Sequence, residues 1–192
     1  LARLTGHVGT FLGTTAFRMN AADSIFCKFA DHFIPIKFWP DIIRQIAING
    51  DVGEVLGKYQ RQSPESTIKK LTPIIEDVMG PKDYKQLDQR MSDYIELGPS
   101  LKNLRKNSPL SVAFTHSMLK IPKVAKSLKA ALEIEYRYTF RAQEKTDFLE
   151  GIRAMVIDKD RNPSWRHESL KDVKEEEVLS LLEPITLNFG EH

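Results

Sequence analysis

The sequence is poor in several features that would assign it to a specialised class of protein. It has a single cysteine, Cys27, which excludes an intrachain disulfide and favours a reducing compartment. No uninterrupted apolar run approaches the roughly 20 residues needed to span a bilayer, so we expect no membrane segment. The 28 basic and 26 acidic side chains leave a formal net charge of +2, which is too balanced to indicate a nucleic-acid partner.

What is present is enough apolar material for a core, arranged with a helical period. Hydrophobic residues make up 41% of the 192 positions, which suits one globular domain or a large part of one. Gly50 is a stop signal for a helix over 41–49, and Pro35 ends a short predicted strand at 32–34. Further helices are predicted near Phe11, within 51–81 on either side of a polar loop at 60–67, and at 21–28, 83–95, 100–106, 109–119, 124–142, 148–157 and 175–182.

Two of these helices carry recognisable start signals. Ser108 is a natural N-cap, and Pro109 occupies the first helical position, where its missing N–H costs nothing. Asp147 is a predicted N-cap with Glu150 three residues later, which is the spacing of a capping box. The apolar residues of 148–157 then form one face of a helix that we expect to be buried.

No cluster of side chains indicates a metal ion or a nucleophile. The histidines are scattered and never form an i, i+4 pair beside a carboxylate, so we predict no metal site. Cys27 suits a half-buried structural thiol, and Asp158 with Asp160 suits a solvated acidic pair. The five histidines concerned are His7, His32, His116, His167 and His192.

Lysines recur every three residues at 120, 123, 126 and 129. They could line a surface for an acidic partner, but Pro122 interrupts the helical spacing and no aromatic residues alternate with them. A solubilising surface is therefore the favoured interpretation, and partner binding is the alternative.

One stretch is specific enough to indicate a family. Residues 147–165 read DFLEGIRAMVIDKDRNPSW, with an Asp-Phe-x-Glu-Gly start, an Arg-Ala pair and a Pro-x-Trp end. This stretch resembles the C-terminal signature of 3-hydroxyisobutyryl-CoA hydrolases, a branch of the enoyl-CoA hydratase/isomerase (crotonase) superfamily. Residues 9–35 are similar to the segment that follows the active-site strand in crotonase relatives, and residues 108–111 and 135–137 match as well.

The resemblance implies a mainly α fold, namely the C-terminal helical region of an α/β crotonase-like spiral with at most one or two short strands. It divides the chain into three parts. Residues 1–35 would form the end of the crotonase core with link helices. Residues 36–107 would form a helical insertion, and residues 108–192 a C-terminal helical cap.

The resemblance also implies a parent enzyme that cleaves the thioester of 3-hydroxyisobutyryl-CoA with water, as in valine catabolism. In this family the catalytic carboxylates and the oxyanion-binding N–H groups lie N-terminal to the position that matches Leu1. We therefore expect no catalytic residue in this chain and no activity of the chain alone. The alternative reaction is that of an enoyl-CoA hydratase or isomerase. The alternative of another class is a non-catalytic helical module that binds a partner.

Two residues are predicted to bind substrate by the same resemblance. Lys159 lies where relatives place a lysine that approaches a phosphate of coenzyme A. Phe140 is the candidate for the aromatic side chain that packs on coenzyme A, with Tyr136 or Tyr138 as alternatives.

The remaining expectations concern cofactors, partners and location. The family chemistry needs no cofactor, because coenzyme A is part of the substrate. The expected partner is an acyl-CoA, with no nucleic acid and no membrane. A homo-oligomer and association with an N-terminal half both stay open. The expected location is cytoplasmic, or the mitochondrial matrix in a eukaryote.

Overall fold

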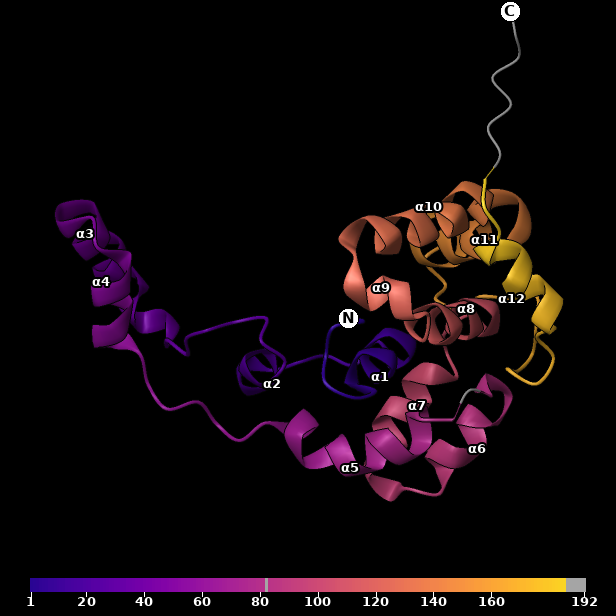
Figure 1. Ribbon diagram of the computed structural model, residues 1–192, viewed down its shortest axis with the longest axis horizontal. Coiled ribbons are helices and arrows are strands. Elements are labelled where there is room, and N and C mark those ends of the chain that lie inside the picture. Colours follow the sequence, from indigo (N-terminus) through magenta and orange to yellow (C-terminus); the bar gives the residue numbers. More distant parts are fainter. Residues whose placement is uncertain (82, 186–192) are drawn as a thin grey trace, which may run out of the picture. The chain divides into compact units, whose positions relative to one another are not determined.

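The computed structural model describes residues 1–81 and 83–185, and every regular element within them is helical (Figure 1). Contacts divide the chain into two compact units. One unit combines residues 1–17 with the described residues from 74 onward, and the other consists of residues 18–73. The mainly α fold predicted from the helical period is therefore confirmed.

The smaller unit is built on one buried carboxylate. Asp23 is fully buried in α2 (Ala21–Phe26), and its Oδ1 accepts hydrogen bonds from the Ser66 hydroxyl at 2.8 Å and the Ile68 N–H at 2.9 Å. These bonds tie α2 to the start of α5 (Thr67–Met79). Because a buried carboxylate is costly without partners, this bonding accounts for the position of α2 within the unit.

A helical hairpin completes the smaller unit. A 3-10 turn, η1 (Ile36–Phe38), leads into α3 (Trp39–Asn49), which ends at Gly50 in the left-handed region with φ 69°. Asp51 then caps α4 (Val52–Tyr59) by accepting from the Glu54 N–H at 2.9 Å. The predicted stop at Gly50 is confirmed, since glycine adopts this backbone conformation without the steric cost of a Cβ.

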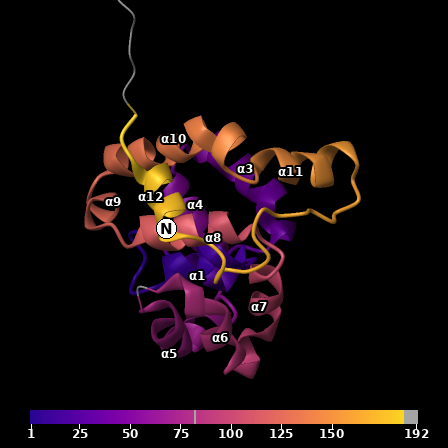
Figure 2. The same ribbon diagram turned by 90° about the vertical axis from the view of Figure 1, so that its right-hand side faces the viewer.

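The larger unit is organised around α8 (Pro109–Leu119). Buried residues occur all round this helix, which is the pattern of a central helix rather than a surface one. It contacts α1 (Val8–Thr15) on one side and α12 (Glu175–Leu182) on the other, and α12 packs on α10 (Leu128–Lys145), as Figure 2 shows.

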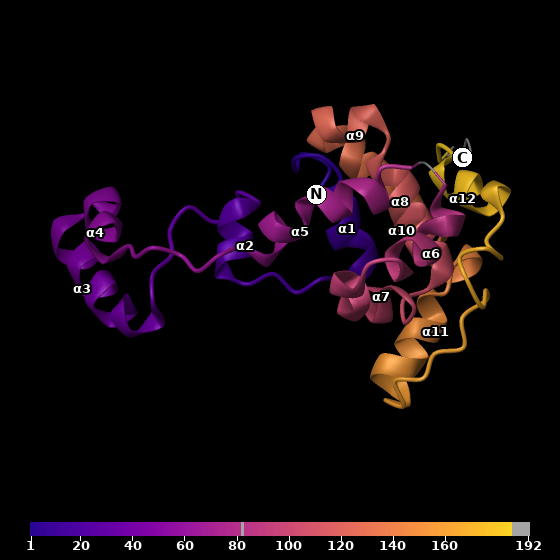
Figure 3. The same cartoon turned by 90° about the horizontal axis from the view of Figure 1, so that it is seen from below.

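Shorter elements surround this centre (Figure 3). The second half of α5 contributes Ile75, Val78 and Met79 to the core. The other elements of the larger unit are η2 (Tyr84–Gln86), α6 (Leu87–Ser92), η3 (Ile95–Leu97), α7 (Gly98–Leu104), α9 (Pro122–Lys126), α11 (Phe148–Ile152) and the π-helical turn η4 (Arg153–Ile157). Within the described residues, no helix has the length and apolar character to cross a membrane.

The start of α8 confirms its predicted cap. The Ser108 hydroxyl accepts from the Ser111 N–H at 3.2 Å, and Pro109 occupies the first turn. The predicted helix over 124–142 is instead two helices, because Ser127 leaves the helical conformation and its hydroxyl accepts from the Ala130 N–H at 3.3 Å to cap α10. The predicted helix over 83–95 is likewise broken, into η2 and α6.

Two expectations about local structure are wrong. Residues 32–34 do not form a strand. A strand needs a ladder of hydrogen bonds to a partner, whereas the backbone bond described for this segment is one, from the Arg61 N–H to the Phe33 carbonyl at 3.0 Å. The apolar face of 148–157 is not buried, since Met155 is 58% and Val156 63% exposed. A π-helical turn carries an extra residue, so positions three or four apart in η4 no longer share one face.

The predicted three-part division at 1–35, 36–107 and 108–192 does not coincide with the two units. It concerns how the chain would be divided within a crotonase-like protein, and it stays a prediction.

Candidate functional site

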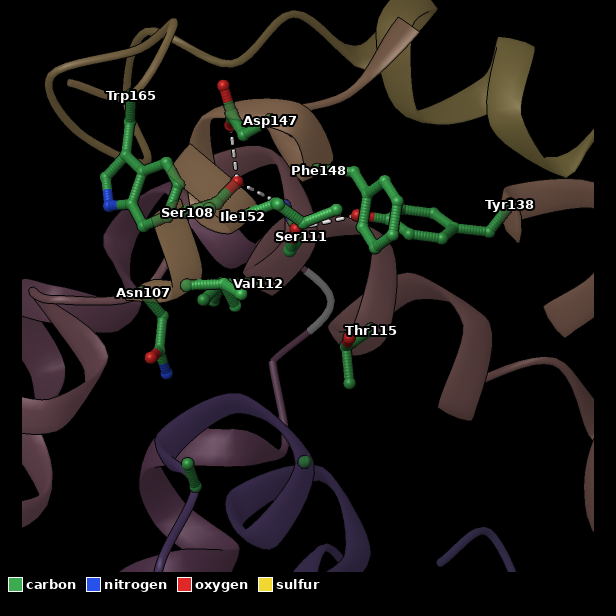
Figure 4. A pocket seen from close by; sticks show the side chains of 14 residues that line it. Asn107, Ser108, Ser111, Val112, Thr115, Tyr138, Asp147, Phe148, Ile152 and Trp165 are labelled. Atoms are coloured by element: carbon green, nitrogen blue, oxygen red, sulfur yellow. Dashed lines mark hydrogen bonds between the residues drawn. The ribbon is translucent and has the colours of Figure 1, made fainter. Parts of the chain in front are cut away.

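A cavity of about 490 Å³ lies in the larger unit, between α1, α8, α10, α11 and the segment around Trp165 (Figure 4). Its apolar lining includes Val112, Phe148, Ile152 and Val156. Its polar lining comprises Asn107, Ser108, Ser111, Thr115, Tyr138 and Asp147. A concave, mostly apolar space with a few polar groups is the usual form of a small-molecule site.

One end of the cavity is closed by a buried carboxylate. Asp147 is 4% exposed, and its Oδ2 accepts from the Ser108 hydroxyl at 2.5 Å. Its Oδ1 accepts from the Arg166 N–H at 2.9 Å. Asp147 thereby joins the starts of α8 and α11 to the segment that follows Trp165, and both of its oxygens are occupied.

The capping box predicted for Asp147 and Glu150 is wrong, because the Asp147 side chain makes these bonds in its place. The Asp147 side chain makes no cap bond to α11, and the Thr146 hydroxyl accepts from the Phe148 N–H at 3.2 Å instead. Glu150 points to Arg153 and to the Ser164 N–H rather than back to the start of the helix. Long-range partners have outcompeted the local ones.

A pair of hydroxyl groups lies in the cavity wall. The Ser111 Oγ of α8 and the Tyr138 Oη of α10 are 2.7 Å apart, and either can be the donor. The Tyr138 ring also packs on the Phe114 ring, with centroids 4.5 Å apart. Both side chains are half-buried, so the pair lies at the boundary between the core and the cavity.

The opposite wall is held by side chains that bond to the backbone. The Trp165 indole N–H donates to the Lys106 carbonyl at 3.0 Å. The Asn107 amide donates to the Thr14 carbonyl at 3.0 Å, which links the start of α8 to the end of α1. These bonds fix Trp165 and Asn107 as rigid parts of the lining.

Three acids of the 147–165 motif form an ion-pair cluster around Arg153. Its guanidinium donates to Glu150 at 2.8 and 2.9 Å, to Asp158 at 2.6 Å and to Asp160 at 2.7 Å. It also donates to the Asn162 carbonyl at 3.1 Å. The cluster therefore holds η4 and the loop that follows it.

The cluster sets the charge state of its acids. The hydrogen bonds from Arg153, followed by that from the Ser164 N–H, lower the pKa of Glu150 to about 2. The same guanidinium lowers the pKa of Asp160, and its three carboxylate partners raise the pKa of Arg153. Acids held ionised in this way are poor proton donors at neutral pH, so a structural role fits better than acid–base chemistry.

The predicted substrate-binding residues lie outside the cavity. Lys159 is exposed between Asp158 and Asp160, with its backbone in the left-handed region at φ 57°. Phe140 is 55% exposed on α10, where its ring lies 6.1 Å from that of Tyr136. The structure does not bring Lys159 and Phe140 together in the cavity, and their binding roles stay predictions. Of the alternatives to Phe140, Tyr138 lines the cavity.

Phe140 belongs instead to an exposed apolar row on α10. Leu128 is 67% exposed, Leu132 54% and Tyr136 54%, at intervals of four residues that place all of them on one face with Phe140. A shallow groove follows the first part of this row.

The histidines are dispersed through the fold. His32 bonds to Gln60 at 2.7 Å, His167 to Glu177 at 3.0 Å, and His7 lies 4.0 Å from Glu76. Within residues 1–81 and 83–185, no group of three or more metal-ligating side chains is arranged to hold an ion. His192 lies outside the described residues. Cys27 is buried, and burial followed by the charge of Asp23 raises the pKa of its thiol, which disfavours a nucleophile.

His116 is the exception among the histidines, because it is fully buried and neither ring nitrogen has a hydrogen-bond partner among residues 1–81 and 83–185. Burial, helped by the positive charges of Lys120 and Arg90, lowers the pKa of His116 to about 3. It is therefore a neutral core side chain at pH 7.

The lysine row does not act as one surface. The Lys120 ammonium donates to the carbonyls of Met79, Gly80 and Pro81 at 2.7, 2.9 and 2.5 Å, so it stabilises the end of α5. Lys129 lies 3.9 Å from Glu133. Lys120 is therefore engaged within the protein and does not support a partner-binding row. For the other lysines of the row, partner binding stays a prediction.

Sequence patterns did not single out the hydroxyl pair of the cavity. Ser111 and Tyr138 are 27 residues apart, on different helices. Each has only an indirect signal: Ser111 belongs to the motif that opens α8, where its N–H serves the cap, and Tyr138 is an alternative to Phe140 for packing on coenzyme A.

Comparison with known proteins gives the family. A family model described as enoyl-CoA hydratase/isomerase matches residues 1–182. The mitochondrial 3-hydroxyisobutyryl-CoA hydrolase of Rattus norvegicus is 31% identical over 194 residues, covering 94% of this chain and 50% of the relative. The corresponding protein of Homo sapiens is 30% identical, with coverage of 93% and 49%. The chain belongs to the enoyl-CoA hydratase/isomerase family, and the predicted resemblance is confirmed.

Solved structures agree with this assignment. An enoyl-CoA hydratase from Rhodobacter sphaeroides 2.4.1 is 39% identical with a TM-score of 0.83, covering 96% of this chain and 53% of that chain. A carnitinyl-CoA dehydratase from Mycobacterium thermoresistibile, at 24% identity and a TM-score of 0.84, shares the fold. The predicted crotonase-like fold is therefore confirmed. The chain spans about half the length of the curated relatives it matches.

Proposed function

We propose that this protein acts on an acyl-CoA thioester and that its reaction is the hydrolysis of 3-hydroxyisobutyryl-CoA. Mitochondrial relatives that carry this enzyme name match nearly the whole chain at 26–31% identity. The proposed reaction adds water across the thioester carbonyl and releases the hydroxy acid and coenzyme A.

The observation that carries the proposal is the position of the family signature at the cavity. Asp147 and Trp165, the two ends of the signature, both line the space, and Phe148 and Ile152 add apolar surface between them. A short branched acyl group would bury its carbons against these walls. The cavity is thus the proposed acyl site.

The residues of the cavity are suited to binding rather than to proton transfer. Asp147 is the carboxylate that lines it, and each of its oxygens accepts a hydrogen bond from the protein. A general base must reach the reacting group, whereas Asp147 is only 4% exposed and its bonds hold it in the wall. The proposed contribution of these residues is therefore to bind and orient the acyl group and to exclude water.

Water addition to an unsaturated acyl-CoA is the second candidate reaction. It is favoured by the 39% identity to the solved structure of an enoyl-CoA hydratase from Rhodobacter sphaeroides 2.4.1. Both reactions begin with the same class of thioester, so the proposed acyl site serves either one.

The test compares the two reactions and binding on one sample. The 22.0 kDa chain is titrated with 3-hydroxyisobutyryl-CoA and with crotonyl-CoA, and thiol release and loss of the conjugated double bond are followed. Saturable binding of the hydroxyacyl thioester is expected, and thiol release would favour the hydrolase over the hydratase. Hydration of crotonyl-CoA without thiol release would favour the second candidate. Neither binding nor turnover would contradict both.

A further inference from the structure

The Ser111–Tyr138 pair has hydrogen-bonding capacity beyond the bond that joins its members. A serine and a tyrosine hydroxyl each carry one hydrogen, and one hydrogen makes the 2.7 Å bond between them. Whichever residue donates, the other keeps its hydrogen. The pair can therefore always donate one further hydrogen bond, and it also has lone pairs that can accept one.

The spare donor and acceptor of the Ser111–Tyr138 pair lie beside apolar surface, where they can bind a polar group of a ligand. Phe148, Ile152 and Val112 line the same cavity, and Figure 4 shows Ser111 and Tyr138 joined within it. An apolar group placed against the pair would leave the spare hydroxyl unsatisfied, which costs free energy. The pair therefore favours a ligand that places a hydrogen-bonding group there.

Several other polar groups of the lining already make hydrogen bonds. The Ser108 hydroxyl donates to Asp147 and also accepts the cap bond of α8. The Trp165 indole N–H and one N–H of the Asn107 amide donate to backbone carbonyls. The hydroxyl pair keeps both a donor and an acceptor for a second hydroxyl, and it holds them at one place in the wall.

We infer that Ser111 and Tyr138 form a specificity site for the hydroxyl of a short branched hydroxyacyl group. The inference rests on the proposed function and goes beyond it, because it names the residues that distinguish a hydroxyacyl thioester from its unsubstituted analogue. The apolar walls hold both ligands through the same carbons, and the pair favours the hydroxylated one. A single net hydrogen bond corresponds to an affinity ratio of roughly 3 to 10.

The test measures this ratio with a probe in the cavity wall. The chain has two tryptophans, so Trp39→Phe leaves Trp165 of the lining as the reporter. This protein is titrated with 3-hydroxyisobutyryl-CoA, isobutyryl-CoA and free coenzyme A, the last as a control for absorbance by the adenine. The hydroxyacyl thioester is expected to bind roughly 3 to 10 times more tightly than isobutyryl-CoA.

The decisive variant removes both hydroxyls together. Ser111→Ala with Tyr138→Phe leaves neither partner unsatisfied, and such paired replacements are nearly neutral for folding. The affinity ratio should fall to about 1, because the hydroxyacyl thioester loses its partner and isobutyryl-CoA no longer leaves a hydroxyl unsatisfied. Tyr136→Phe is the matched control, since it removes a hydroxyl from an exposed position of the same helix outside the cavity and should leave the ratio as it was.

The outcomes separate this inference from the proposed function. Binding of both thioesters with no preference, or with a preference that survives the double variant, overturns the specificity site and leaves the proposed function standing. Absence of binding by every thioester overturns the acyl site itself. Binding that calorimetry detects but that leaves the emission of Trp165 unchanged places the ligand elsewhere and also overturns the inference. If the double variant does not fold, Ser111→Cys with Tyr138→Phe carries the test, because a thiol is a weak donor and a weak acceptor, and at least a twofold fall in the ratio is expected.

Discussion

The unpartnered His116 makes a direct prediction about stability and pH. The side chain is fully buried in α8, its ring lies 6.3 Å from that of Tyr84, and neither nitrogen is hydrogen-bonded. His116→Phe keeps a ring at this position and removes the titratable group. At neutral pH the gain from removing two unsatisfied nitrogens opposes the strain of a larger ring, so we expect a small net change.

A larger difference in unfolding free energy between wild type and His116→Phe should appear on acidification. In the unfolded chain His116 titrates near 6.5, whereas in the folded protein burial lowers its pKa to about 3. The unfolded state therefore binds the proton first, and folding stability is retained above about pH 6.5 and lost as the pH falls toward 3. A pH of 5 lies 1.5 units below the unfolded-state pKa of 6.5. His116 should therefore lower the free energy of unfolding by about 2 kcal/mol at this pH.

Chemical denaturation at pH 7.5 and pH 5 measures this loss. Wild-type protein should lose about 2 kcal/mol more unfolding free energy between these pH values than His116→Phe does. His32→Phe is the comparison variant, because it makes the same substitution at an exposed histidine. Equal losses in wild type and His116→Phe would refute the reasoning, since they would show that His116 is protonated or exposed in the folded protein.

Three further predictions concern the bonds that shape the cavity and the smaller unit. Ser108→Ala removes the cap of α8 and one partner of the buried Asp147, so thermal or chemical unfolding should show a loss of about 1–3 kcal/mol, and Ser108→Thr should recover most of it. Arg153→Lys keeps the charge but loses the bidentate geometry of the ion-pair cluster. Limited proteolysis should therefore cut within 158–165 faster than in wild type, and faster still in Arg153→Ala. Equal cleavage rates would contradict the role of Arg153 in holding this loop. Asp23→Leu removes the acceptor that ties α2 to α5, and hydrogen exchange in 18–73 should accelerate while α8 stays protected; a uniform change would contradict the two-unit description.

Much of the local structure could be predicted from the sequence, because its signals act over a few residues. Ser108 and Pro109 open α8, and Gly50 ends α3 in the left-handed conformation, as expected. The family could also be predicted, since the order of residues in 147–165 is specific. These inferences needed no knowledge of which helices meet.

The same local signals did not predict the site. Asp147 carries the spacing of a helix cap, but its oxygens bond to Ser108 and to the Arg166 N–H, 39 and 19 residues away. The predicted ligand residues Lys159 and Phe140 lie outside the cavity, whereas Tyr138, two residues from Phe140 of the exposed row, lines it. Two positions apart on α10 is enough to change which side of the helix a residue occupies.

The sequence by itself therefore determined the helical class, the caps and the family, because each depends on residues close together in the chain or on a motif read as a string. Only the tertiary structure decided that the signature closes a cavity, that Arg153 gathers its acids into a clamp, and that Ser111 meets Tyr138. These features join side chains far apart in sequence, and a buried polar group takes whichever partner packing brings within hydrogen-bond distance.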